Sequence, residues 1–375
     1  MNVRTSVVGL TLLTATFRPI ARSETYSVTS GVDGAIGSLR WAVECSHTNP
    51  GRDRVVFSLP APYTIPLTNC IAITDSLELD GTTQPGYTGQ PVVVISRTSS
   101  TESLYFDDCA SNLVKGIRFS DSGGGVLFLY GGDSRVENCW FVSNNVGIYL
   151  HNSPSNTIGG GADYRNVFLY CGTATYIDGT NSSGNSVSGN YIGLYPSGQV
   201  GGNRNGVEIF AGSENTIGGT GASMRNLFAG HQTAVYIAAT NNVVIGNWIG
   251  LDPSGTGAAE NTNSASYGIY ISQGASNTIG GASADLRNVI VSNLSAGISI
   301  NGTNATGNRV LGNYIGTGPS GTTALPNSAG IILDGASANF IGGTNAGEGN
   351  LICSSNSGLD INQGNSNTIY GNYIG

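Results

Sequence analysis

Two short phrases alternate along this chain and constrain its fold more than any other feature. Asn-Thr-Ile-Gly-Gly occurs at residues 156–160, 215–219 and 277–281, and it returns as Asn-Phe-Ile-Gly-Gly at 339–343. Gly-Asn-Tyr-Ile-Gly occurs at 189–193, 312–316 and 371–375, with Trp in place of Tyr at 246–250. A recurring period of about 60 residues, with short apolar pulses between Gly and Asn, is typical of a repeat architecture.

Three regular units precede these phrases and indicate the length of one coil. The stretches 103–106, 125–128 and 147–150 begin 22 residues apart, and Val114 and Val136 follow at the same spacing. Each unit holds three short strands separated by tight turns, without a 3.6-residue period long enough for helices. The pattern predicts a parallel β-helix, in which each strand pairs with its counterpart one coil away, at about 4.8 Å per coil.

Asparagines and loops recur at fixed points of these coils. Ile and Val are expected to stack inside the tube, while Asn side chains near the turns form ladders between coils. Loop insertions follow each phrase, and those after the second phrase contain Pro-Ser-Gly turns at Pro196, Pro253 and Pro319. The ladder candidates are Asn156, Asn215, Asn277 and Asn339, and separately Asn190, Asn247, Asn313 and Asn372.

The N-terminal region divides into a leader and a cap. Residues 1–23 have the pattern of a secretory signal peptide, with Arg4, an apolar stretch and a small-residue cleavage pattern; the alternative is a disordered leader. Residues 24–70 are expected to form an N-terminal cap, with an amphipathic helix at 38–45 and the first strand. Residues 71–375 are expected to form the β-helix. The sequence stops inside a repeat, which predicts a C-terminal truncation.

Charged residues and cysteines exclude several classes of function. Charged residues make up 10% of the chain, the net charge is −8, and Lys115 is the single lysine. No basic stripe exists to neutralise phosphates, so nucleic acid is not an expected partner. No segment of the mature chain is long enough to span a bilayer. Cys45 and Cys70 flank the first strand-like stretch and are candidates for a disulfide, whereas the other four cysteines lack metal-ligand spacing. No metal or cofactor is expected.

The N-terminal region resembles a known module. Residues 37–43, Gly-Ser-Leu-Arg-Trp-Ala-Val, and 53–57, Asp-Arg-Val-Val-Phe, look like the N-terminal module of secreted bacterial right-handed β-helix proteins named for a Cys-Ser-Leu-Arg-Glu-Ala signature. Gly37 stands where that signature has Cys, and Trp41 where it has Glu. Residues 79–87 and the two phrases are also similar to that group. The resemblance implies an all-β, right-handed parallel β-helix that is secreted or attached to the cell surface, and it implies no reaction.

The polar residues of the regular coils have two interpretations. The first is a solvated ion-pair face, with Lys115 above Glu137 and a cation–π contact of Arg118 above Trp140. The second is a polysaccharide-active enzyme, a lyase or epimerase on a pectate-lyase-like fold, although the Asp-Pro-His signature of epimerases is absent. His47 and His231 are expected to be bystanders. The residues of the second interpretation are Asp107, Asp108, Lys115, Arg118, Asp133, Arg135 and His151.

An apolar column is predicted on the outer side of the third strand of each coil. An aromatic residue falls on every second coil, about 9.6 Å apart. The column has three interpretations: the Pro-Ser-Gly loops cover it, it forms a platform for a glycan, or it forms a protein interface. The candidate ligand-binding residues are Trp140, Tyr191, Trp248, Tyr314 and Tyr373. From Arg118 upward the column continues through Trp140, Val167, Tyr191, Leu227, Trp248, Val289, Tyr314, Leu351 and Tyr373.

The sequence therefore predicts a non-catalytic extracellular rod. Its expected role is that of an adhesin, a spacer or a polysaccharide-binding protein, with a polysaccharide or a surface protein as partner. The alternatives are the polysaccharide-active enzyme described above and one segment of a larger adhesin. No catalytic residue is assigned.

Overall fold

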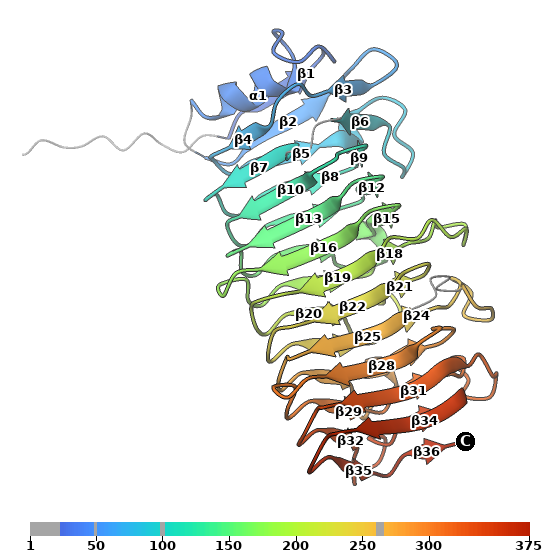
Figure 1. Ribbon diagram of the computed structural model, residues 1–375. Helices are drawn as coiled ribbons and strands as arrows, with labels where there is room; N and C mark the ends of the chain where they lie inside the picture. Colours follow the sequence, from blue (N-terminus) through green and yellow to red (C-terminus); the bar gives the residue numbers. More distant parts are fainter. Residues whose placement is uncertain (1–22, 49–50, 98–101, 260–265) are drawn as a thin grey trace, which may run out of the picture.

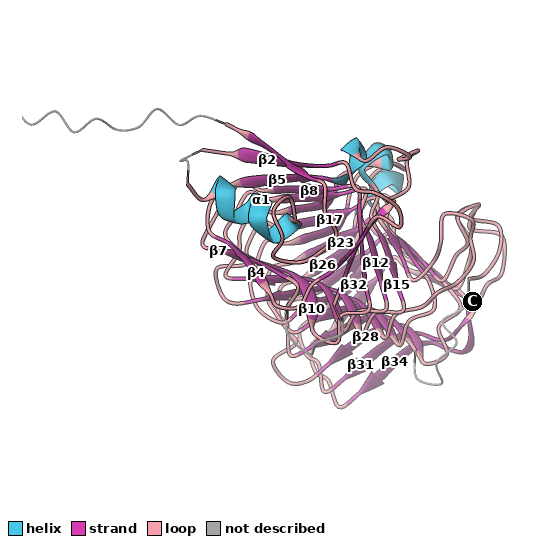
Figure 2. Ribbon diagram, turned by 90° about the horizontal axis from the view of Figure 1, so that it is seen from above, coloured by secondary structure: helices cyan, strands magenta, loops and turns pink. Residues whose placement is uncertain are grey.

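The chain winds into one rod-shaped solenoid (Figure 1). The computed structural model describes residues 23–48, 51–97, 102–259 and 266–375, so the predicted signal peptide lies outside the described residues except for Ser23. Each coil contributes strands to three sheets, named A, B and C, and neighbouring strands pair in parallel (Figure 2). The prediction of an all-β, right-handed parallel β-helix is confirmed.

Sheet A has 13 strands and includes the most N-terminal strands of the described chain. Its strands are β1 (Thr25–Val28), β2 (Asp53–Phe57), β5 (Leu77–Asp80), β8 (Leu113–Lys115), β11 (Arg135–Glu137), β14 (Thr157–Gly159), β17 (Ser186–Ser188), β20 (Thr216–Gly218), β23 (Val243–Ile245), β26 (Thr278–Gly280), β29 (Arg309–Leu311), β32 (Phe340–Gly342) and β35 (Thr368–Tyr370).

Sheet B has 12 strands, most of them two or three residues long. They are β3 (Thr64–Pro66), β6 (Val93–Ser96), β9 (Ile117–Ser120), β12 (Trp140–Val142), β15 (Val167–Leu169), β18 (Tyr191–Ile192), β21 (Leu227–Phe228), β24 (Trp248–Ile249), β27 (Val289–Ile290), β30 (Tyr314–Ile315), β33 (Leu351–Ile352) and β36 (Tyr373–Ile374).

Sheet C has 11 strands, and ten of them lie after residue 103, which agrees with the ten coils that the sequence predicts from that point. They are β4 (Ile71–Ile73), β7 (Leu104–Asp107), β10 (Gly125–Tyr130), β13 (Val146–His151), β16 (Thr173–Asp178), β19 (Asn205–Ile209), β22 (Thr233–Ile237), β25 (Tyr267–Ser272), β28 (Ala296–Asn301), β31 (Asn327–Asp334) and β34 (Ser354–Asn362).

One α-helix, α1 (Leu39–Ser46), lies across the N-terminal end of the described solenoid (Figure 1). Its first residue is one later than predicted because Ser38 is the N-cap, accepting a hydrogen bond from the Trp41 N–H at 3.2 Å. Leu39, Ala42 and Val43 are buried against the first coil. Short 3-10 helices occupy three loops: η1 (Gly81–Thr83), η2 (Ala162–Tyr164) and η3 (Ala284–Leu286).

Two buried asparagine ladders run through the coils. The side-chain Oδ1 of each Asn accepts a hydrogen bond from the preceding Asn of the ladder. The donor is the side-chain amide or, in the step from Asn242 to Asn277, the backbone N–H, at 2.8–3.3 Å. All eight predicted Asn residues belong to these ladders, but every second rung was not predicted, because one 60-residue repeat spans two coils. The ladders are Asn156, Asn185, Asn215, Asn242, Asn277, Asn308, Asn339 and Asn367, and Asn166, Asn190, Asn226, Asn247, Asn288, Asn313, Asn350 and Asn372.

The 22-residue register holds in sheets A and B but shifts by one residue in sheet C. Val114 pairs with Val136, and Phe119 with Phe141, as the spacing predicts. Leu104 pairs with Leu127, however, which is 23 residues later. The turn before β10 contains one more residue than its counterpart before β13, and this insertion keeps Leu127 inside the tube.

The described thiols form no disulfide. Cys45 and Cys70 are both free, so the pairing that their positions suggested is absent from this structure. Of the four cysteines that the sequence predicts to be buried small hydrophobes, Cys109, Cys139 and Cys171 are buried, whereas Cys353 is partly exposed. Burial raises the pKa of the Cys139 thiol to about 12, which makes it unreactive at neutral pH.

His231 is fully buried beside two backbone carbonyls, and this position predicts an acid-sensitive fold. Its Nδ1 lies 3.2 Å from Asn203 O and its Nε2 lies 3.0 Å from Ile192 O. Burial lowers the pKa of His231 to about 4, against the opposing effect of both carbonyls. Below pH 6.5 the unfolded chain takes up the proton first, so the free energy of unfolding falls as the pH drops from 6.5 to about 4. The expected loss is about 3 kcal/mol, since one pKa unit corresponds to about 1.4 kcal/mol.

Urea unfolding followed by circular dichroism at pH 7, 5.5 and 4.5 tests this prediction. His231→Gln should flatten the decrease between pH 6.5 and 4, whereas His47→Gln should retain it. The Asp33 carboxyl does not account for a decrease between pH 6.5 and 4. Its pKa is lowered to about 2, so its contribution to the free energy of unfolding is lost only as the pH falls below its ordinary pKa of 3.8. An unaltered pH dependence in His231→Gln would contradict the assignment.

Candidate functional site

The predicted apolar column exists as one continuous row on the outer side of sheet B. Strand register aligns Arg118 with Trp140, and each following coil adds the residue that the sequence predicts, ending with the pair of Leu351 and Tyr373. The row is therefore formed by adjacent strands of one sheet. What its aromatic members contact differs along the rod.

Loops and arginines enclose the members of this column in the C-terminal coils. The Arg225 guanidinium lies 4.1 Å from the centre of the Trp248 ring, and Arg287 lies 3.8 Å from that of Tyr314. The Pro-Ser-Gly loop packs against the Trp248 ring so closely that a Cβ added to Gly255 would lie 2.4 Å from it. These two rings are packed between an arginine and a loop. This arrangement corresponds to the interpretation in which the Pro-Ser-Gly loops cover the column.

The members of the column nearer the N-terminus line an open pocket of about 310 Å³. Trp140 and Tyr191 contribute to its wall together with Arg165, whose guanidinium lies 5.0 Å from the Tyr191 ring centre. Tyr195, from the adjacent loop, packs edge-on against Trp140 at 6.1 Å. Tyr373, in the last strand, is 74% exposed. The five predicted residues therefore share a column but not one environment.

The predicted polar patch is divided between sheets. Lys115, on sheet A, pairs with Glu78 and Asp80 at 3.2 Å each, and Arg54 also bonds to Asp80. Burial raises the pKa of Asp80, but the hydrogen bonds from Thr82 and Arg54 and the charge of Lys115 outweigh it, so the net pKa is lowered. This group is a structural ion-pair network at the N-terminal end of the rod.

The other polar candidates also lie in separate surroundings. Arg135 pairs with Glu137 at 3.0 Å on sheet A. Lys115 is aligned with Glu137 in the strand register, but its ion pairs are with carboxylates of β5. Arg118 aligns with Trp140 on sheet B. Asp108 and Asp133 occupy turn positions with positive φ. Asp107 and His151 share a column on sheet C, with Tyr130 between them. The patch is therefore not one cluster.

His151 belongs to a small hydrogen-bonded group that the sequence analysis missed. His151 Nδ1 lies 3.4 Å from the Asp178 carboxylate, and the Tyr149 hydroxyl donates to the same carboxylate at 3.1 Å. The Asn152 amide lies 3.1 Å from His151 Nε2. These contacts fit the imidazole tautomer that carries its proton on Nδ1 and accepts from Asn152 on Nε2. Burial, and then the hydrogen bond to Asp178, raises the pKa of Tyr149 well above its usual value.

A second aromatic row, on the outer side of sheet C, was also missed. Successive strand pairings place one outward residue of each coil in line. The rings of Phe128 and Tyr149 pack edge to face at 4.8 Å, and those of Tyr149 and Tyr176 at 5.2 Å. All but Phe128 are partly exposed. We call this row the sheet C column; it consists of Tyr105, Phe128, Tyr149, Tyr176, Glu208, Tyr236 and Tyr270.

An open groove of about 390 Å³ runs beside the middle of the sheet C column. Phe128, Tyr149 and Tyr176 supply its aromatic wall, and Glu208 and Glu102 supply carboxylates. Thr173 Oγ1 and Asn205 Nδ2 both donate to Glu208 Oε1 at 2.6 Å, which holds this side chain in place. Aromatic faces beside fixed hydrogen-bonding groups are the elements from which small-molecule sites are built.

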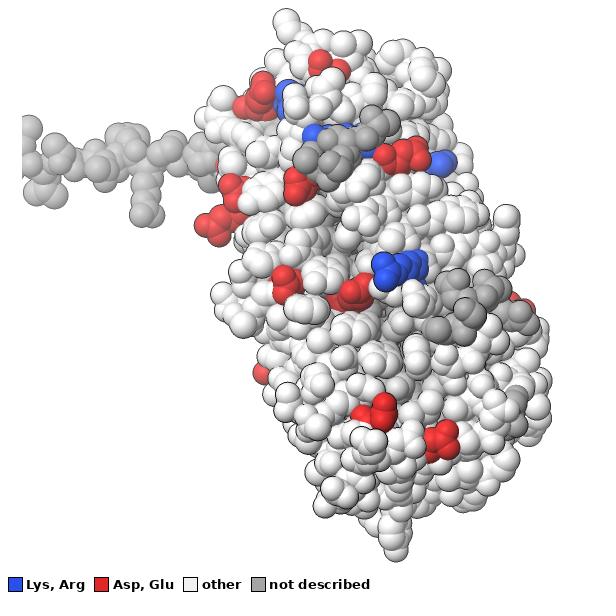
Figure 3. Space-filling view, in the orientation of Figure 1, with Lys and Arg blue, Asp and Glu red and all other residues white. Residues whose placement is uncertain are grey.

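The face of sheet C carries an excess of negative charge. Its strands contain Asp107, Asp178, Glu208, Asp334 and Asp360, and these strands contain no lysine or arginine. In Figure 3, which views this face, the visible charged atoms in the lower half of the rod are all acidic. The strands of sheet C therefore give this face a net negative charge.

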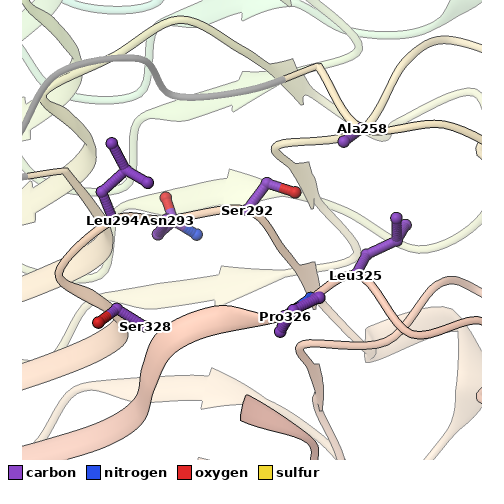
Figure 4. A pocket seen from close by; sticks show the side chains of 7 residues that line it. All are labelled: Ala258, Ser292, Asn293, Leu294, Leu325, Pro326 and Ser328. Carbon is purple, nitrogen blue, oxygen red and sulfur yellow. The ribbon is translucent and has the colours of Figure 1, made fainter. Parts of the chain in front are cut away.

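A larger hollow of about 490 Å³ lies where the loops after sheet B reach the start of sheet C (Figure 4). Leu294, Leu325 and Pro326 give it an apolar character, and Leu294 is 53% exposed. Among the described residues, its lining contains no charged or titratable side chain. It offers apolar contact but no group for chemistry.

Part of the chain matches the model of a known protein family. Residues 67–250, just under half of the chain, match the family model described as periplasmic copper-binding protein (NosD). Copper favours clusters of Cys, Met and His ligands. Among the described residues, no group of three or more His, Cys, Asp or Glu side chains is placed to hold a metal ion. A search of curated protein sequences gives no significant match.

Solved structures of similar shape include polysaccharide-active proteins. The A-module of the mannuronan C-5 epimerase AlgE4 of Azotobacter vinelandii has a TM-score of 0.53 at 12% identity, over 94% of this chain and 99% of that one. A PL6 alginate lyase in complex with a trisaccharide has a TM-score of 0.35 at 12% identity, over 94% and 88% of the two chains. The catalytic domain of a GH87 α-1,3-glucanase in complex with nigerose has a TM-score of 0.37 at 11% identity, over 92% and 68%.

At these identities the likeness concerns the fold alone. None of the described helices is long and apolar enough to cross a membrane. The strand topology, the family match and the likeness to the epimerase module agree with the resemblance that the sequence indicated. The chain is a right-handed parallel β-helix protein.

Proposed function

We propose that this protein is an exported or cell-surface β-helical rod that binds a polysaccharide along sheet C without changing it. The observation that carries the proposal is the sheet C column beside an open groove. Five of its seven positions carry a partly exposed ring, and successive coils are about 4.8 Å apart. A polymer lying along the rod would therefore meet an aromatic ring in most of the successive coils.

Location outside the cytoplasm is part of this proposal. The N-terminal 23 residues have the pattern of a signal peptide, and the family whose model matches residues 67–250 is described as periplasmic. An extracytoplasmic rod with a repeating surface is suited to contact with polymers of the cell envelope or of its surroundings.

Two features of the groove favour binding over catalysis. A general base must offer a free lone pair to the proton that it removes. The lone pair of His151 Nε2 accepts from the Asn152 amide. The raised pKa of Tyr149 keeps its hydroxyl protonated as a donor to Asp178. In this arrangement His151 and Tyr149 fix the groove wall, and neither of them acts as a free base.

The second candidate function is that of a polysaccharide lyase or epimerase. It is favoured by the proximity of Tyr149, His151 and Asp178, three side chains of types used in acid–base chemistry. Such an enzyme would leave unsaturated ends or inverted sugar residues in the polymer. A pure binder leaves the polymer unaltered, so the product analysis given in the Discussion separates the two.

Affinity electrophoresis measures binding directly. We expect the protein to be retarded in gels that contain a bound polysaccharide, and we expect Tyr149→Ala/Tyr176→Ala to weaken this retardation about tenfold or more. Each aromatic contact contributes about 0.5–1.5 kcal/mol, and 1.4 kcal/mol corresponds to a factor of ten. Circular dichroism melting verifies that the variant is folded.

Two further variants act as controls. Tyr373→Ala removes an exposed tyrosine of sheet B and should leave retardation unchanged. Trp140→Ala/Tyr191→Ala removes the pocket on sheet B, so a loss of binding in this variant alone would move the site to the predicted column. The absence of retardation in every gel would overturn the proposal and favour an adhesin or spacer with a protein partner.

A further inference from the structure

We infer that the ligand of the sheet C groove is a neutral glycan and that polyuronates are rejected. This inference rests on the proposed function, because it names the class of polysaccharide for the same surface. It starts from the charges of the groove. Glu102 and Glu208 line the groove, and Asp178 lies beside its wall, hydrogen bonded to Tyr149.

The cations of the neighbouring sheets are engaged elsewhere. Lys115 and Arg54 are paired with the carboxylates of β5 on sheet A. Arg225 and Arg287 are stacked on sheet B aromatics and donate to backbone carbonyls there. Two arginines remain near the groove: Arg97 donates to the backbone oxygen of Glu102, and Arg204, one residue before β19, has its Nε 3.4 Å from the neutral Gln232 amide oxygen. The three carboxylates of Glu102, Asp178 and Glu208 outnumber these two cations, so the net field at the groove is negative.

Glu208 is positioned to bind hydroxyl groups. The hydrogen bonds that it accepts from described residues, from Thr173 and Asn205, both end on Oε1. Oε2 of the same carboxylate is left to accept from a ligand, and hydrogen bonds to a charged acceptor are stronger than those to a neutral one. A neutral sugar offers hydroxyl donors to this oxygen.

A polyuronate would meet the same groove with like charge. Each sugar of such a polymer carries a carboxylate, and successive sugars would pass Glu102, Asp178 and Glu208 in turn. Like-charge contacts reject a ligand of otherwise suitable shape, and this repulsion is screened by salt within about 10 Å at 0.1 M. Selectivity for neutral chains follows from charge even though the aromatic wall could contact either class.

The test is affinity electrophoresis of the full chain at low salt, with two sets of gels. The neutral set contains pullulan, galactomannan and mixed-linkage β-glucan, and the acidic set contains alginate and polygalacturonate. Retardation by a neutral polymer without retardation by either acidic polymer supports the inference. Retardation by an acidic polymer overturns the selectivity but leaves the proposed function intact. No retardation in either set overturns both.

Charge-neutralising variants test the cause. E208Q keeps the acceptor for Thr173 and Asn205 but removes the charge. Combined with D178N, it should weaken retardation by the neutral polymer by about threefold or more and should allow an acidic polymer to retard the protein at low salt. E214Q removes one charge at an exposed turn and should change neither result. Equal behaviour of E208Q/D178N and the wild-type protein toward both polymer sets would contradict the role given to these carboxylates.

Discussion

Replacing Asn247 with alanine is expected to lower the free energy of unfolding by about 3–5 kcal/mol, since each buried polar group left without a partner costs about 1–3 kcal/mol. Asn247 is fully buried. Its amide donates to Ile217 O at 2.9 Å and to Asn288 Oδ1 at 3.0 Å, and its Oδ1 accepts from Asn226 Nδ2 at 3.0 Å. Its amide also lies 3.0 Å from Ile245 O, and alanine removes all of these contacts and opens a small cavity in the middle of the ladder.

Equilibrium urea unfolding followed by circular dichroism measures this loss. Asn304→Ala is the matched control, because Asn304 lies on an exposed turn outside both ladders, and its stability should change by less than about 0.5 kcal/mol. In a solenoid each coil contacts only its neighbours, so the variant should also broaden the transition by separating the coils on either side. Equal stabilities of Asn247→Ala and Asn304→Ala would show that the ladder does not contribute as argued.

Replacing Phe141 with alanine should destabilise the rod by a similar amount. Its ring lies inside the tube between Phe119 and Phe168, with ring centres at 5.3 and 4.7 Å and nearly parallel planes. Truncation of a buried phenylalanine costs about 3–5 kcal/mol, because the neighbouring coils cannot move together to fill the cavity. The expected result is a large fall in the unfolding midpoint in urea.

Phe210→Ala provides the comparison for Phe141. The Phe210 side chain, immediately after β19, is 54% exposed, so its truncation should change the free energy of unfolding little. A cost for Phe210→Ala equal to that for Phe141→Ala would mean that the inward stack is not the source of stability. The Phe141 variant should still be folded at low temperature, which allows the comparison to be made in one buffer.

The architecture could be predicted from the sequence because its signals are local and repeat. The rungs Asn156 and Asn215 occur in identical phrases, so their alignment was evident. The intervening rung Asn185 lies in a different sequence, Gly-Asn-Ser-Val, and was recognised only once the structure aligned the coils. The same alignment explains why the sheet B column was predicted: its residues lie inside the second phrase or at a fixed offset from an inward residue.

The sheet C column could not be found in the same way. The additional residue before β10 displaces Phe128 from the position that a strict 22-residue spacing assigns to the partner of Tyr105. Farther along, the loop between β18 and β19 separates Tyr176 from Glu208 by 32 residues, so a fixed period does not align them. Coverage of Trp248 by a loop also depends on tertiary packing, which no local pattern encodes.

The most direct test of the account is the fate of a bound polymer. The protein is incubated with the polysaccharide that retards it most strongly, and the polymer is then examined by size-exclusion chromatography with light scattering and by proton NMR. We expect the polymer to keep its length and its sugar configuration, and we expect the wild-type protein to bind it about tenfold or more tightly than Tyr149→Ala/Tyr176→Ala does. Shortened chains, unsaturated ends or inverted sugars would contradict a binding protein and establish an enzyme.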